Sequence, residues 1–116
     1  MDKLKVLDSL KAWNCDVNGA LERFLGDEDL YCSCLEIFAK DENFYRLKEH
    51  IAAGEYEKAF DAAHTLKGVS GNLGLTPLYH AIINILEPLR SKDYSNLDSL
   101  YEGVMENFKI YLSLIV

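Results

Sequence analysis

Apolar residues recur at intervals of three and four positions along almost the whole chain, and this spacing limits what the chain can fold into. Leu4, Leu7, Leu10 and Trp13 form the first such stripe, and another extends over residues 97–115. Residues with this spacing lie along one side of an α-helix, where they can be buried against other helices. No run of four to eight residues alternates apolar and polar side chains between turn residues, as a half-buried strand would. We therefore expect an all-α protein.

Glycines end several of these helical stripes. Gly26 is expected to end a short helix near the N-terminus and Gly74 a longer one, because glycine readily adopts the left-handed conformation found just after helices. The connections are short, which favours antiparallel packing of consecutive helices. The sequence thus predicts a single domain over residues 1–116. It has one or two short helices in residues 1–26 and an antiparallel up-and-down four-helix bundle in residues 27–116.

Capping residues and prolines predict further helix boundaries. Asp27 is expected as the N-cap of a helix that breaks or bends near residues 40–41. Thr76 and Pro77 are the residue types that favour the N-cap and the first position of a later helix. Pro88 predicts a kink or an early end in that helix, because proline lacks an amide hydrogen and crowds the preceding turn.

The helix predicted between Glu55 and Leu73 has two very different sides. At about 100° per residue, the side opposite His64 carries an apolar stripe made of Ala59, Ala62, Leu66, Val69 and Leu73. Burial of this stripe turns His64 toward solvent. The outward side also carries Glu57, Phe60, Asp61, Lys67, Gly68 and Gly71.

The two glycines on this outward side need a physical reason. Glycine inside a helix costs roughly 1 kcal/mol relative to alanine. Close packing between helices would explain Gly68 and Gly71 only if they lay on the apolar side, and they lie on the side of His64. We therefore favour an accessible site at which another protein reaches the imidazole.

Composition excludes several classes of function. The net charge of −7 makes nucleic acid and anionic membranes poor partners. The chain has neither a secretory signal nor an apolar run long enough for a membrane span, and its Met-Asp-Lys start suggests a cytoplasmic protein.

The three cysteines, Cys15, Cys32 and Cys34, are expected to be reduced, because their number is odd and no secretion signal precedes them. Cys32 and Cys34 point in different directions on a helix, so we predict no metal site. Cys34 is expected as a small core residue.

The segment HTLKGVSGNLG resembles the signature of the histidine-containing phosphotransfer domain of two-component phosphorelays. The residues that carry this resemblance are His64, Lys67, Gly68, Ser70, Leu73 and Gly74. The resemblance extends over roughly residues 16–114. It implies a phosphocarrier without cofactor or kinase activity, which accepts a phosphoryl group from an aspartate of one receiver domain and passes it to another.

Within this resemblance, His64 is expected to be the phosphoacceptor through Nε2. A neutral imidazole has a lone pair that can attack phosphorus without a strong base. Lys67, one turn later, is expected to interact with the phosphoryl oxygens, with an ordinary ion pair to Asp61 or Glu57 as the alternative.

The remaining outward residues are expected to serve docking and access. Gly68 and Gly71 would let a receiver domain approach, and Phe60 and Asp61 would contact it. For Phe60 the alternative is sideways packing against a neighbouring helix. His50 and His80 lack both the glycines and the lysine, so we expect no direct role for either.

Two other interpretations remain open at this stage. The chain could be a helical bundle that binds a receiver or another signalling protein without transferring phosphate, or a piece of a hybrid or chemotaxis-type kinase. The expected partners are response-regulator receiver domains, with a hybrid histidine kinase as a further candidate, and we expect a monomer.

Overall fold

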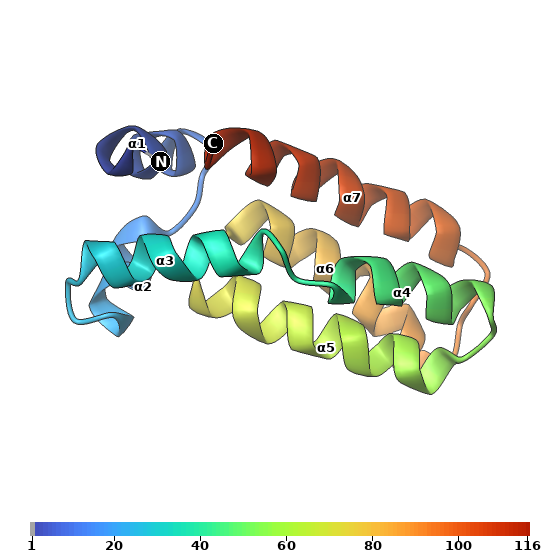
Figure 1. Ribbon diagram of the computed structural model, residues 1–116. Coiled ribbons are helices and arrows are strands. Elements are labelled where there is room, and N and C mark those ends of the chain that lie inside the picture. Colours follow the sequence, from blue (N-terminus) through green and yellow to red (C-terminus); the bar gives the residue numbers. More distant parts are fainter. Residues whose placement is uncertain (1) are drawn as a thin grey trace.

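The computed structural model describes residues 2–116, and within this range it is built of helices alone (Figure 1). The seven helices are α1 (Lys3–Ala12), α2 (Val17–Arg23), α3 (Glu28–Phe38), α4 (Asn43–Ala52), α5 (Tyr56–Asn72), α6 (Thr76–Ser91) and α7 (Leu97–Leu114). The prediction of an all-α fold is confirmed.

The long helices form an antiparallel bundle. Figure 1 shows α3 and α4 end to end along one side, with α5, α6 and α7 running up and down beside them. α5 packs between α4 and α6, and α6 packs against α7. α1 and α2 lie at one end of the bundle, next to the C-terminus (Figure 1).

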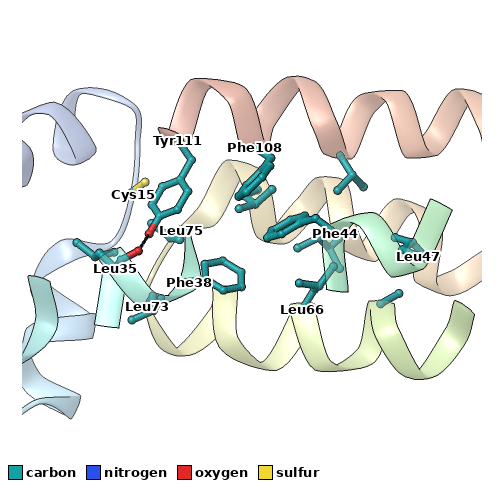
Figure 2. Close-up of a cluster of buried hydrophobic side chains, with 14 of the residues drawn as sticks. Cys15, Leu35, Phe38, Phe44, Leu47, Leu66, Leu73, Leu75, Phe108 and Tyr111 are labelled. Carbon is teal, nitrogen blue, oxygen red and sulfur yellow. Dashed lines mark hydrogen bonds between the residues drawn. The ribbon is translucent and has the colours of Figure 1, made fainter. Parts of the chain in front are cut away.

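The break or bend expected near residues 40–41 is a break between α3 and α4. Two tyrosines of α7 form hydrogen bonds to the helices on either side of this break. The Tyr111 hydroxyl donates to the carbonyl oxygen of Leu35 over 2.5 Å (Figure 2), and the Tyr101 hydroxyl donates to that of Phe44 over 2.7 Å. Burial raises the pKa of both phenols, so they remain protonated donors. α3 and α4 thus act as one side of the bundle although the backbone helix is interrupted.

Aromatic rings fill the core where α3, α4 and α7 meet (Figure 2). The rings of Phe44 and Phe108 stack with centroids 3.8 Å apart, and Phe38 lies 5.3 Å from Phe44. Leu66 of α5 is fully buried on the opposite side of this cluster. Burial of Leu66 sets the rotation of α5 in the bundle, because turning the helix would remove this side chain from the close-packed core.

Two predicted helix boundaries need correction. α6 begins at Thr76 rather than after it, and the Thr76 hydroxyl donates backward to the carbonyl oxygen of Gly74 (3.3 Å) instead of capping the helix. Pro88 lies inside α6, which continues to Ser91. The helix therefore does not end early at Pro88, and its C-cap is Lys92, which takes the left-handed conformation. Asp27 caps α3 as expected, accepting from the amide of Leu30.

The end of α5 is where the N-terminal helices attach. Gly74 adopts a positive φ of 70°, as predicted, and its carbonyl oxygen accepts from the amide of Asp16 over 2.8 Å. The Tyr31 hydroxyl of α3 donates to the carbonyl oxygen of Leu73 over 2.7 Å. Arg23 of α2 donates to the carbonyl oxygens of Gly71 and Asn72. These bonds satisfy carbonyls that the end of a helix otherwise leaves without partners.

We predict that Gly74→Ala destabilises the fold more than Gly54→Ala. Both glycines have a φ of 70°, so alanine costs about 1–2 kcal/mol at either position. At Gly74 an added Cβ would also overlap the backbone carbonyl of Asp16, whereas at Gly54 it meets nothing within 4 Å. Urea unfolding followed by the fluorescence of Trp13 measures both losses. Equal losses would contradict the close approach of Asp16.

Candidate functional site

His64 is exposed in the middle of α5. The opposite side of the helix is buried, with Ala59, Ala63 and Leu66 fully inaccessible to solvent. Within the predicted stripe only Val69 is half-buried rather than buried. The imidazole thus projects from the bundle because the other side of α5 supplies core contacts.

The two glycines on the outward side are in different surroundings. A Cβ added at Gly68 meets nothing within 4 Å, so the backbone beside His64 is open. A Cβ added at Gly71 would lie 3.7 Å from the ring of Tyr79 on α6, and Gly71 is half-buried. Gly68 is therefore the more open of the two glycines, and Gly71 lies beside Tyr79 of α6.

Lys67 is half-buried one turn after His64. Within residues 2–116 its ammonium group forms no ion pair, so the expected alternative of pairing with Asp61 or Glu57 is not observed. Its backbone carbonyl accepts from the hydroxyl of Ser70, which is buried. The hydrogen bond from Ser70 thus engages only the backbone of Lys67, and the ammonium group of its side chain is not in an ion pair within the described residues.

Phe60 both packs sideways and flanks the histidine. It is half-buried at the edge of the core, and its ring stacks on that of His64, with centroids 5.9 Å apart and an angle of 26° between the planes. The guanidinium carbon of Arg90 lies 5.7 Å from the centroid of the Phe60 ring. Sequence reasoning missed Arg90, because it comes from α6 and only the packing of α6 on α5 brings it here.

Two shallow grooves run along α5 on either side of this face. One, of about 350 Å³, lies between α5 and α6, and the other, of about 260 Å³, lies between α4 and α5. Asp61 lines both. The first is rich in aromatic rings, and the second contains Arg46, His50 and Lys58.

The other two histidines lie elsewhere. His50, at the end of α4, has Nδ1 3.2 Å from a carboxylate oxygen of Glu55. The pKa of Glu55 is lowered, first by the hydrogen bond from Lys58 and then by that with His50. His80 is exposed on α6 beside Tyr79. Neither histidine has an open glycine next to it on its helix.

The cysteines are free thiols. Cys15 and Cys32 are buried, and Cys34 is half-buried and packs against the core rather than lying inside it. Burial raises the pKa of Cys15 to about 12 and keeps this thiol protonated. Within residues 2–116 no three histidine, cysteine, aspartate or glutamate side chains come close enough to share a metal ion. None of the helices described has the length and apolar character that crossing a membrane requires.

A family model described as the Hpt domain matches residues 41–104, more than half of the 116 residues. The chain belongs to the Hpt domain family. The matched residues include α4, α5, α6 and the first part of α7, with His64 inside them. Comparisons with curated proteins and with solved structures gave no match. Membership gives this Hpt domain a phosphotransfer role in two-component signalling, in which such domains work with receiver domains.

We predict that Gly68→Ala stabilises this Hpt domain by about 1 kcal/mol, because alanine is the better helix former and an added Cβ meets open space. Gly103→Ala in α7 is the matched control, since a Cβ added there also meets nothing within 4 Å. Thermal unfolding measures both changes. Destabilisation by Gly68→Ala together with stabilisation by Gly103→Ala would show that the backbone beside His64 is not open.

Proposed function

We propose that His64 accepts a phosphoryl group from the aspartate of one receiver domain and passes it to the aspartate of another. The observation that carries this proposal is the exposure of His64 on α5 next to Gly68, where the added Cβ meets nothing within 4 Å. A receiver must bring its aspartate to the imidazole, and the open backbone leaves room for that approach. The Hpt family supports the same role.

The chemistry is a displacement at phosphorus. A lone pair of the neutral imidazole, which we assign to Nε2, attacks the phosphorus of the aspartyl phosphate. A P–N bond forms as the P–O bond to the carboxylate breaks, and the carboxylate leaves with the electron pair. Transfer to the second receiver reverses these bonds. The chain needs no nucleotide for either step, so we propose a phosphocarrier without kinase activity of its own.

Lys67 supplies positive charge near the transferred group. Phosphoryl transfer passes through a loose transition state with negative charge on the equatorial oxygens. Lys67 lies one turn from His64 and has no competing ion pair within residues 2–116. An ammonium group near the surface contributes on the order of 1 kcal/mol. We therefore assign it a moderate stabilising role.

Phe60 and Asp61 are the proposed receiver contacts. Asp61 is exposed and lines both grooves beside α5, and Phe60 offers apolar surface next to the imidazole. A hybrid histidine kinase that carries a receiver domain is a further candidate donor. The monomeric state and the cytoplasmic location remain predictions.

We predict that His64→Gln folds normally and accepts no phosphate from phosphorylated receivers, because the amide has no lone pair that can replace the ring nitrogen. His80→Gln, which alters another exposed histidine, is the control and keeps full labelling. The measurement is incorporation of acid-labile, base-stable phosphate into the full chain. If a panel of phosphorylated receivers leaves the unaltered chain unlabelled, it is a binding module that does not transfer phosphate.

We predict that Lys67→Ala slows transfer about fivefold, which corresponds to the loss of about 1 kcal/mol of charge stabilisation. Lys67→Arg keeps the charge and recovers most of the rate. Lys58→Ala is the control, because this exposed lysine pairs with Glu55 rather than facing the imidazole. Rapid-quench measurement of transfer from a phosphorylated receiver gives the rates. Equal effects of Lys67→Ala and Lys58→Ala would contradict the assignment.

A further inference from the structure

Among the side-chain hydrogen bonds within residues 2–116, none involves a ring nitrogen of His64. A reactive histidine is commonly oriented by a hydrogen bond to its second nitrogen. An exposed histidine without such a bond can occupy several rotamers on a helix. Some other contact must orient this ring if it is held for reaction.

Phe60 supplies that contact. It precedes His64 by four residues, so the two side chains meet on the surface of α5. Their centroids lie 5.9 Å apart and their planes differ by 26°, which is an offset stacked arrangement of the two rings. The lone pair that attacks phosphorus lies in the plane of the ring. Stacking on a face therefore restrains the imidazole and leaves its nitrogens free.

Phe60 is itself held from a second helix. Its ring packs at the edge of the core, and Arg90 of α6 lies over it within the distance of a cation–π interaction. Glu87, one turn before Arg90, lies 3.8 Å from its guanidinium group. Arg90, Phe60 and His64 thus form a row of contacts that extends the packing of α6 on α5 to the surface.

We propose that Arg90 is a positioning residue, which acts through Phe60 to keep the His64 imidazole in the orientation that reacts. Its effect on transfer rests on the proposed function, but the restraint on the ring does not. Arg90 contacts the ring of Phe60 rather than the reacting atoms. Loss of the stack would spread the imidazole over the other staggered rotamers and slow transfer about threefold to fivefold.

The ring restraint is tested by NMR on the full chain with labelled histidine. We expect three-bond couplings of His64 that report one dominant rotamer, and ring protons shifted upfield by Phe60. Phe60→Leu should average the couplings and remove the shift, and Phe60→Tyr should preserve both. Arg90→Gln should average the couplings in part, and Arg90→Lys should not. Arg46→Gln, which alters an exposed arginine of α4, should change nothing. Unchanged couplings in either Phe60→Leu or Arg90→Gln would overturn the proposal.

The effect on transfer is tested with a phosphorylated receiver as donor. Arg90→Gln should lower kcat about threefold to fivefold and leave KM unchanged, and Arg90→Lys should recover most of kcat. A change in KM alone would show that Arg90 contacts the receiver, and it would overturn the positioning role. If the unaltered chain accepts no phosphate, the proposed function fails, and the NMR couplings still decide whether the stack orients His64.

Discussion

The burial of one side of α5 is the constraint from which the site follows. That side carries alanines and a single leucine at its centre, and Ala59, Ala63 and Leu66 are completely buried. Small side chains let α4 and α6 approach α5 from both flanks, and the aromatic cluster of α3, α4 and α7 closes over Leu66 (Figure 2). Because this burial sets the rotation of α5, its other side faces solvent. His64 lies on that side.

Features that lie within one helix could be predicted from the sequence. The rotation of α5, the cap at Asp27 and the left-handed Gly74 depend on residues a few positions apart, so spacing and residue type are sufficient. Arg23 and Arg90 could not be found in this way. Each reaches α5 from another helix, and no local pattern indicates which long side chain will arrive there. The sequence predicted a break or bend between α3 and α4, but not the hydrogen bonds of Tyr101 and Tyr111 to the two helices, because these side chains come from α7.

An open glycine in a helix does not by itself mark a site. A Cβ added at Gly103 in α7 also meets nothing within 4 Å, and the structure gives no reason for that glycine. Gly68 differs because His64 and Lys67 share its side of α5. The cost of about 1 kcal/mol for such a glycine is a noticeable part of a typical stability of about 5–15 kcal/mol. Gly68 lies beside an exposed imidazole and an ammonium group that is unpaired within residues 2–116. This combination favours access by a partner protein as the reason for a glycine at this position.

A phosphocarrier must also release what it accepts, and this limits how strongly the site should hold a phosphoryl group. Deep burial of several cations around His64 would stabilise the phosphorylated state as well as the transition state, and onward transfer would then slow. The arrangement here avoids that. Lys67 is only half-buried, so solvent screens its charge. Arg90 lies over the ring of Phe60 rather than next to the nitrogen that reacts. Orientation by stacking affects the imidazole before and after phosphorylation alike, so it favours transfer in both directions without trapping the intermediate.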